Sequence, residues 1–268
     1  MTMKNDRQKP GSKQYYRRCI FFILIIFPSL YILEARFHPR FDHLTINDGL
    51  SQSSVQSICQ DSRGFVWMAT QEGLNRYDGY SFKVFKNIPH DSTSLSDNFV
   101  TSVFEDSRKN LWVATVNGLN LFDRNTETFL RFFMKDSLGK RATIFKLVED
   151  LEGNIWLAVA RNGLIRFNPD KRKWKRFFHQ KRADSKEDLR RMSALAVDKE
   201  RGIWFGVINR GLYHFDPRTG KLLAFRNRLA DQNSLPHNLI NCILPDAKNR
   251  IWIGTNGGLD SLEPLTGK

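Results

Sequence analysis

One pattern recurs five times along the chain and limits the folds that the chain can adopt. In each copy an Asp is followed six residues later by a Trp, and a Gly-Leu pair comes after the Trp. The residues of this repeat frame are Asp61, Trp67, Gly73, Asp106, Trp112, Gly118, Asp150, Trp156, Gly163, Asp198, Trp204, Gly211, Asp246, Trp252 and Gly258. Successive Trp residues are 45, 44, 48 and 48 positions apart. A period in the forties is typical of the blades of a β-propeller, which are small sheets stacked around an axis.

The second copy predicts the strands of one blade. Short runs rich in apolar and β-branched residues, bounded by Asp, Asn and Gly, predict strands over Val100–Glu105, Leu111–Thr115, Leu119–Phe122 and Thr128–Phe133. None of these runs has helical periodicity. The sequence therefore predicts an all-β fold of four-stranded blades over residues 41–268. The fifth copy ends at the last residue of the sequence, before its outer strand, so we expect a propeller truncated in the fifth blade.

The frame residues have separate structural roles in this prediction. An Asp at the start of a turn accepts hydrogen bonds from backbone N–H groups two residues on, and Gly64, Gly153 and Gly202 suit a positive φ in that turn. In the other two copies Lys109 and Asn249 occupy the turn. Each Trp presents a large apolar face that one small sheet cannot bury alone, so the sheets must pack side by side.

The first 40 residues differ from the rest of the chain. Residues 1–18 are polar and basic, and an apolar run extends from Cys19 to Leu33. A run of this length fits either the core of a signal peptide or a short membrane anchor, so we assign residues 19–35 to a signal anchor or signal peptide. The absence of a small-x-small cleavage site favours an uncleaved anchor. Because basic residues stay inside, we expect a cytoplasmic tail over 1–18, a single pass through the bacterial inner membrane and a periplasmic C-terminal domain.

The net charge of +14 is unevenly placed. Residues 1–40 hold eight Lys and Arg against two acidic residues, and the rest holds 34 basic against 26 acidic residues. A pI near 9.9 often indicates nucleic-acid binding, but an exported domain does not meet nucleic acid, so we expect no such partner. Basic clusters at 171–176 and 181–191 are expected to decorate outer strands and loops, and attraction to anionic lipids or acidic glycans is the alternative. Trp174 is expected to pack on its own blade rather than stack on a sugar.

The Cys and His residues do not indicate a cofactor, a metal site or a catalytic group. Cys59 and Cys242 have no ligand spacing, and we expect both to be buried small hydrophobic residues. The six His residues contain no pair at metal-ligand spacing. His214 lies in an alternating strand and is expected to face solvent or a sheet edge.

The ligand site is expected on one face of the propeller. The turns after the Trp strands and the crossings between blades should meet there, and loops held by a rigid scaffold often bind ligands. The two long crossings are Lys86–Asn98 and Asn227–Asn238. They contain the candidate ligand-binding residues His90, Asn98, His237 and Asn238.

The repeats resemble the two-component regulator propeller repeats of bacterial membrane sensors. The first copy shows this most clearly, in Asp48-Gly49-Leu50-Ser51, in residues 61–67 and in residues 70–79. The resemblance covers roughly residues 41–268 and implies a periplasmic sensor region built from seven-bladed propellers. It also implies an immunoglobulin-like module, a second membrane helix and a cytoplasmic output such as a histidine kinase or diguanylate cyclase. It further implies a small-molecule or saccharide ligand. We also expect the membrane as a partner, through the N-terminal helix, and a second copy in a homodimer.

Five copies are fewer than such a ring contains. Phe41–Asn47 looks like a lone strand that could complete the last blade, so we expect an open arc or a strained five-blade closure. The sequence contains no phosphoacceptor-His box, nucleotide-binding Gly motif or cyclase motif, so we expect a non-catalytic sensor region without its output domain. The alternatives are a propeller lyase or hydrolase that acts on polysaccharide, and a structural remnant. The Asp-to-Trp spacing of six departs from the sialidase Asp-box, which needs five.

Overall fold

A computed structural model describes residues 41–135, 139–178 and 191–263. The chain divides into two compact units, residues 1–43 and 44–268. The predicted cytoplasmic tail (1–18) and signal segment (19–35) lie outside the described residues. In the described part of the chain, no helix is long and apolar enough to cross a membrane.

Residues 44–268 form five antiparallel sheets, each built from strands that are consecutive in the sequence. Sheet 1 contains β1 (Val55–Gln60), β2 (Val66–Thr70), β3 (Gly73–Tyr77) and β4 (Phe82–Phe85). Sheet 2 contains β5 (Val100–Glu105), β6 (Leu111–Thr115), β7 (Gly118–Asp123) and β8 (Thr128–Phe132). Sheet 3 contains β9 (Ile144–Glu149), β10 (Ile155–Val159), β11 (Gly163–Asn168) and β12 (Lys173–Phe177). Sheet 4 contains β13 (Met192–Val197), β14 (Ile203–Val207), β15 (Gly211–Phe215) and β16 (Leu222–Phe225). Sheet 5 contains β17 (Ile240–Pro245), β18 (Ile251–Thr255) and β19 (Gly258–Leu262).

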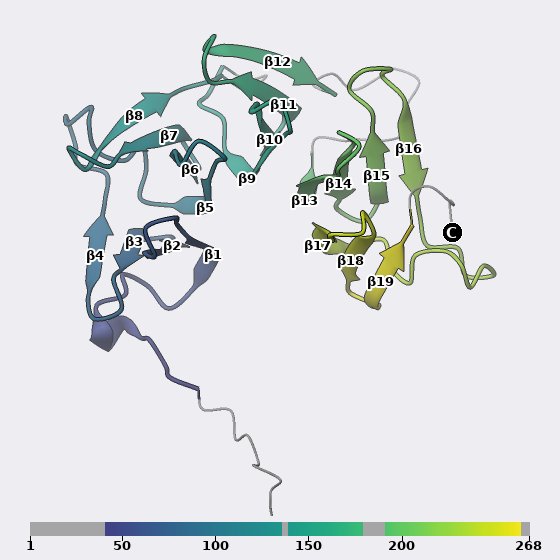
Figure 1. Cartoon of the computed structure of the whole chain (residues 1–268), viewed down its shortest axis with the longest axis horizontal. Helices are drawn as coiled ribbons and strands as arrows, with labels where there is room; N and C mark the ends of the chain where they lie inside the picture. Colours follow the sequence, from purple (N-terminus) through teal and green to yellow (C-terminus); the bar gives the residue numbers. More distant parts are fainter. Residues whose placement is uncertain (1–40, 136–138, 179–190, 264–268) are drawn as a thin grey trace, which may run out of the picture. The chain divides into compact units, whose positions relative to one another are not determined.

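The sheets are the blades of a β-propeller, which confirms the predicted fold class. The first strand of each sheet lies on the inside and packs against the first strand of the next sheet, in the order β1, β5, β9, β13 and β17 (Figure 1). Each Trp lies on the second strand of its sheet, and each Gly-Leu pair begins the third strand. The four strands predicted for the second copy match β5 to β8 to within one residue at each end.

The Asp of each copy binds the Trp of the same copy, a contact that explains their six-residue spacing. The indole Nε1 donates to the carboxylate oxygen Oδ2 at 2.8, 2.8, 2.7, 2.7 and 3.1 Å in the five sheets. The other oxygen, Oδ1, accepts from the backbone N–H groups two and four residues on. In sheet 1 these donors are Arg63 and Phe65, at 2.9 and 3.0 Å. The predicted turn role of the Asp is therefore confirmed, and the sequence analysis missed the indole as its further partner.

The Trp side chains are buried where a following sheet covers them. Trp67, Trp112, Trp156 and Trp204 are at most 1% exposed, and each belongs to a core cluster shared with the next sheet. Trp252 of sheet 5 is only half-buried. The predicted packing of indoles between sheets is therefore confirmed for the four copies that have a following sheet.

The outer faces of sheets 1 and 5 are open in the described part of the chain. Ile58 of β1 is 64% exposed, whereas Val103 at the same position of β5 is 4% exposed. Leu259 of β19 is 68% exposed, whereas Leu74 at the same position of β3 is fully buried. These apolar residues occupy core positions of the repeat but have no neighbouring sheet. The five blades thus form the predicted open arc.

Two sequence predictions about single segments are wrong. Phe41–Asn47 is not a strand, because Thr45 and Asp48 form a capping box around the single 3₁₀ turn Ile46–Asp48. The positive φ in the fourth Asp turn belongs to Arg201 (72°) rather than to Gly202. Gly202 instead makes room for a side chain, since a Cβ there would lie 2.0 Å from His214 Nε2.

His214 and Cys242 also differ from the predictions. His214 is largely but not fully shielded, with 23% of its side chain exposed, because its ring lies 4.4 Å from the Trp204 ring and its Nε2 lies 3.4 Å from Asp198 Oδ2. Cys242 is exposed, although Ala194 at the same position of β13 is 3% exposed. The cause is again the open face of sheet 5. Cys59 is half-buried, and burial raises the pKa of its thiol.

The first basic cluster lies on the outer strand of sheet 3. Lys173, Lys175 and Arg176 of β12 are exposed, as predicted. Trp174 stacks on Phe167 of the same sheet, with ring centroids 4.0 Å apart, so its packing on its own blade is confirmed. Positive charges on an edge strand discourage pairing with strands of other molecules. The second cluster lies outside the described residues except for its last member, Arg191.

The Gly of each Gly-Leu pair provides a test of blade packing. Gly118 has φ of 132°, and a Cβ there would lie 2.9 Å from the Phe132 carbonyl oxygen of the neighbouring strand. Gly258 has nearly the same φ, 135°, but nothing lies within 4 Å. Both alanine substitutions strain the backbone, and only Gly118→Ala also overpacks it. We expect Gly118→Ala to destabilise the protein by about 1–3 kcal/mol more than Gly258→Ala in denaturant unfolding. Equal losses would contradict this packing.

Candidate functional site

A β-bulge interrupts the inner strand of every sheet at the same place. The strand pairing skips one residue at the second position of β1, β5, β9, β13 and β17. The five bulge residues are Gln56, Thr101, Phe145, Ser193 and Asn241. A bulge redirects the side chain of the extra residue, and bulges are over-represented next to functional sites.

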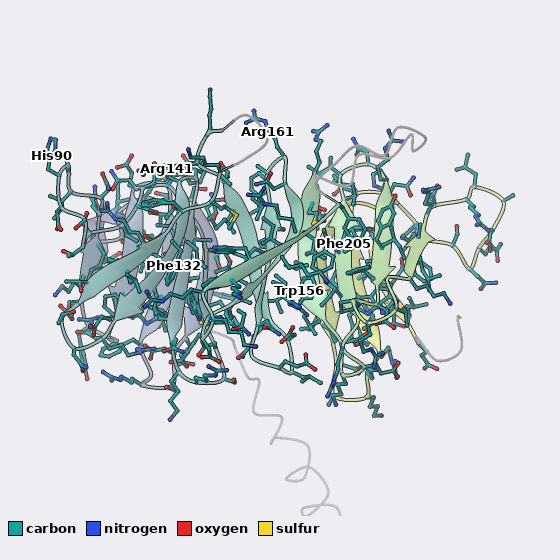
Figure 2. All side chains as sticks on the ribbon, turned by 90° about the horizontal axis from the view of Figure 1, so that it is seen from above. His90, Phe132, Arg141, Trp156, Arg161 and Phe205 are labelled. Carbon is teal, nitrogen blue, oxygen red and sulfur yellow. The ribbon has the colours of Figure 1, made fainter. Side chains whose placement is uncertain are left out.

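The turn after each Trp strand is fixed to the crossing that leads into the same sheet. In sheets 2 to 5 a backbone N–H of the turn donates to a carbonyl just before the inner strand, at 3.1, 2.8, 2.9 and 3.2 Å. The donors are Val116, Ala160, Ile208 and Asn256. The crossings and these turns therefore meet at one end of the sheets, as predicted. Figure 2 shows Arg161 of one such turn and Arg141 and His90 of two crossings along the same edge.

The bulges and turns surround a cavity of about 990 Å³ at the inner edge of sheets 1 to 4. We call it the inner cavity. Four of the five bulge residues line it, from Gln56 to Ser193, and the fifth, Asn241, instead donates to Asn256 Oδ1 at 2.9 Å. The other lining residues are Phe99, Val116, Thr143, Lys146, Ala160, Arg161, Arg191, Met192 and Ile208. The walls thus combine apolar surface with a few polar groups, as is common in ligand pockets.

Some polar groups of the inner cavity are engaged and others are not. Thr101 Oγ1 donates to the Ile144 carbonyl at 2.5 Å, and Thr143 Oγ1 donates to the Val116 carbonyl at 3.0 Å. Ser193 Oγ is buried and has no hydrogen-bond partner among the described residues. A buried hydroxyl without a partner is unfavourable, and a ligand or water atom would satisfy it.

The sequence analysis missed the bulge residues. All five lie five residues before the Asp of their own copy, where the chain holds Gln, Thr, Phe, Ser and Asn. The next position also varies, with Ser57, Lys146 and Cys242 among its residues, so variation among the copies does not single out the bulge.

The predicted residues Asn98 and Asn238 have the same structural role in two crossings. Asn98 Oδ1 accepts from the Asn87 N–H at 2.7 Å, and Asn238 Oδ1 accepts from the Asn227 N–H at 2.8 Å. Each bond joins the beginning of a long crossing to the end of the same crossing. Neither residue lines the inner cavity, and their ligand role stays a prediction.

The two predicted His residues lie at different places in their crossings. His90 is exposed at the tip of its crossing with a positive φ of 67°. His237 Nδ1 accepts from the Leu239 N–H at 2.9 Å, as Asp97 Oδ1 does from the Phe99 N–H in the other crossing. The structure does not bring either His to the inner cavity, and their ligand role also stays a prediction.

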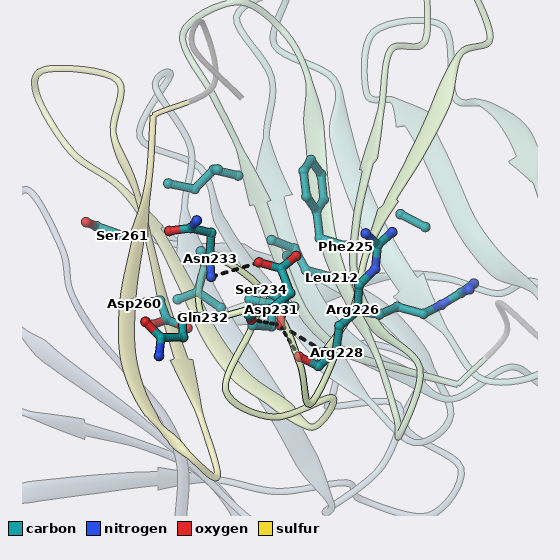
Figure 3. A pocket seen from close by; sticks show the side chains of 14 residues that line it. Leu212, Phe225, Arg226, Arg228, Asp231, Gln232, Asn233, Ser234, Asp260 and Ser261 are labelled. Carbon is teal, nitrogen blue, oxygen red and sulfur yellow. Dashed lines mark hydrogen bonds between the residues drawn. The ribbon is translucent and has the colours of Figure 1, made fainter. Parts of the chain in front are cut away.

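A second cavity of about 420 Å³ lies between the last crossing and the edge of β19 (Figure 3). Asp260 contributes a buried oxygen, Oδ2, that has no hydrogen-bond partner among the described residues, and burial raises the pKa of this carboxyl. In sheet 2 the same position is Asn120, which accepts from the Ser96 N–H at 3.0 Å and donates to Ser96 Oγ at 2.9 Å. The corresponding crossing residue in sheet 5 is Pro236, which has neither group.

Within the ranges that the structure describes, no three His, Cys, Asp or Glu side chains are grouped as metal ligands. The inner cavity presents cations, hydroxyls and aromatic rings, which together suit reversible binding of a polar molecule.

The chain was compared with known proteins. The family model described as "Two component regulator propeller" matches residues 49–72, 94–117 and 234–257. "Histidine kinase P4" of Formosa agariphila is 45% identical over 74 residues, which are 28% of this chain and 5% of that protein. The chain thus spans a small part of this curated relative.

Among solved structures, the extracellular domain of a putative hybrid two component system from B. thetaiotaomicron matches with a TM-score of 0.72 and 23% identity. The match covers 85% of this chain and 31% of that one. Virginiamycin B lyase from Staphylococcus aureus matches with a TM-score of 0.57 and 13% identity, over 78% of this chain and 69% of that one. At these identities the structural matches show the shared propeller fold.

The repeat frame, the Asp–Trp contact in every blade and the matched family model agree. The three matched segments fall on copies 1, 2 and 5, and the intervening copies 3 and 4 repeat the same frame. The chain therefore carries two-component regulator propeller repeats, which the family model matches over residues 49–72, 94–117 and 234–257.

Proposed function

We propose that this chain is the ligand-sensing propeller region of a membrane-bound signal-transduction receptor, and that its ligand binds non-covalently in the inner cavity. The observation that carries the proposal is the set of bulge side chains. Each sheet of a constant scaffold directs one variable residue toward the centre, and four of these residues line one cavity. Such an arrangement changes specificity without changing the fold.

The similar proteins support a sensing role. A curated relative is named a histidine kinase, and the similar structures described above include the extracellular domain of a putative hybrid two component system. A periplasmic position and an anchor over residues 19–35 follow from the positive-inside rule. An alkaline-phosphatase fusion after residue 60 is expected to be active in a Gram-negative host, and an inactive fusion would contradict export.

Ligand binding in the inner cavity can be tested with two variants of the same strand. Gln56 and Gln60 are both exposed on β1, but only Gln56 lines the inner cavity. We expect a neutral or acidic oligosaccharide from a defined panel to raise the Tm of the full chain in detergent, because a ligand that binds the folded state stabilises it. Gln56→Trp should fill the cavity and abolish the shift, whereas Gln60→Trp should keep it.

Two results would contradict the proposal. An unchanged shift in Gln56→Trp would place the ligand elsewhere, and no shift with any member of the panel would remove the evidence for sensing at this cavity. The fold shared with a lyase makes an enzyme the second candidate. Chromatography of each oligosaccharide after incubation with the chain distinguishes a sensor from an enzyme. A sensor leaves its ligand chemically unchanged, whereas a lyase or hydrolase cleaves it.

A further inference from the structure

The positively charged residues of the inner cavity all lie on one side of it. Three cationic residues line it, and all belong to sheets 3 and 4 or their connections: Lys146, Arg161 and Arg191. The wall formed by sheets 1 and 2 is uncharged, with Gln56 and Thr101. No Asp or Glu is among the described residues that line the cavity.

The backbone holds the three cationic residues at fixed places around the cavity. Lys146 is in β9, paired with Ala158 of β10 directly after the bulge. Arg161 is in the turn that follows β10, with a positive φ of 60°. The Arg191 carbonyl accepts from the Ile208 N–H at 2.9 Å, which fixes the start of β13. Placement on strands and bonded turns reduces the ordering cost when a ligand binds.

A hydroxyl lies on the same side of the cavity as these cations. Ser193 is the bulge residue of β13, two residues after Arg191, and its buried Oγ has no partner among the described residues. Cations together with a hydroxyl donor match the oxygens of a carboxylate or a sulfate ester. On the opposite wall, Phe99 and Val116 offer apolar contact to an uncharged part of a ligand.

We propose that the inner cavity selects an anionic ligand, whose carboxylate or sulfate group binds Lys146 and Arg191 while its uncharged part lies against sheets 1 and 2. The proposal rests on the proposed sensing function and adds the chemical class of the ligand.

The basic strand β12 offers a matched control for nonspecific attraction. Lys173 and Lys175 are exposed on β12 and do not line the inner cavity. Removing two positive charges from either place changes the net charge of the chain equally. If the two double variants, Lys146→Gln/Arg191→Gln and Lys173→Gln/Lys175→Gln, differ in their affinity for an anionic probe, the cause is the position of the charges and not the total charge.

The experiment measures binding of matched probe pairs to the full chain in detergent by titration calorimetry. Digalacturonate is compared with galactobiose, and galactose 6-sulfate is compared with galactose. We expect an anionic probe to bind at least about tenfold more tightly than its neutral partner, with an affinity that decreases as salt increases. The Lys146→Gln/Arg191→Gln variant should weaken its binding by about 10- to 100-fold, and the β12 variant should not. A preference for digalacturonate over galactobiose would indicate a carboxylate ligand, and a preference for galactose 6-sulfate over galactose would indicate a sulfate ligand.

The outcomes separate this inference from the proposed function. Equal binding of a neutral probe and its anionic partner, lost in Gln56→Trp, would overturn the charge selection and leave sensing at the cavity intact. Equal weakening by the cavity and β12 variants would also overturn it, since the attraction would then be nonspecific. If no probe of either kind binds, the inference and the proposed sensing at this cavity both fail. Thermal unfolding of each variant shows whether lost binding follows from lost folding.

Discussion

Replacing Trp156 with alanine is expected to lower the free energy of unfolding by about 3–5 kcal/mol. The indole is fully buried, stacks on Phe177 with centroids 5.3 Å apart and shares a core cluster with Phe205 of the next sheet. Its removal leaves a cavity between two sheets and also leaves the Asp150 carboxylate without its 2.7 Å indole donor. The measurement is denaturant unfolding followed by circular dichroism.

Trp252→Ala is the matched control for this prediction. Trp252 makes the same kind of bond to Asp246, at 3.1 Å, but it is only half-buried on sheet 5. We expect a clearly smaller loss for Trp252→Ala than for Trp156→Ala. Losses of equal size would mean that burial between sheets is not the source of the stability, and the stacking explanation of the repeat would fail.

The second large effect is expected for Asp61→Ala. The Asp61 side chain is inaccessible to solvent and accepts from Trp67 Nε1 at 2.8 Å and from Arg124 Nη1 at 2.6 Å, besides two backbone N–H groups. Arg124 belongs to the next sheet, so this carboxylate also joins two blades. Alanine leaves the buried indole without its acceptor and removes one of the two carboxylates that Arg124 binds, the other being Glu105 at 2.6 Å, and we expect a loss of about 3–5 kcal/mol in denaturant unfolding.

Asp123→Ala is the control for an Asp that only forms a turn. Asp123 Oδ1 accepts from the Asn125 N–H at 2.8 Å, but its side chain is exposed. We expect little change in stability for this variant. A loss comparable to that of Asp61→Ala would show that turn formation, rather than the buried contacts, explains the effect.

The pH dependence of stability provides an independent check on Asp61. Burial raises the pKa of this carboxyl, but hydrogen bonds from Arg124, Trp67 and the Arg63 N–H outweigh burial and lower it below its ordinary value. A lowered pKa in the folded state adds stability above the unfolded pKa of about 3.9 and loses it as pH falls through the folded value. We therefore expect the free energy of unfolding to fall below about pH 4, and to fall less steeply in Asp61→Ala.

The inner cavity was harder to predict than the blades. The sequence analysis placed the ligand face correctly at the crossings and the turns after the Trp strands, but it chose candidates in the long crossings because these are long and polar. Asn98 and Asn238 proved to bind their own loops. The bulge residues lie inside strands, where a regular alternation hides them. A bulge is a property of strand pairing, and pairing is not visible in one strand.

By itself, the sequence determined the blades, because a buried indole and its Asp must recur once in every sheet that packs against another. The spacing of Asp, Trp and Gly-Leu is local, and local hydrogen bonds and turns enforce it within each copy. Only the tertiary structure decided which side chains converge on the inner cavity and which apolar residues, such as Ile58 and Leu259, stay exposed. Both outcomes depend on what lies beside a residue in a neighbouring sheet, and the contacts between sheets join residues more than 40 positions apart.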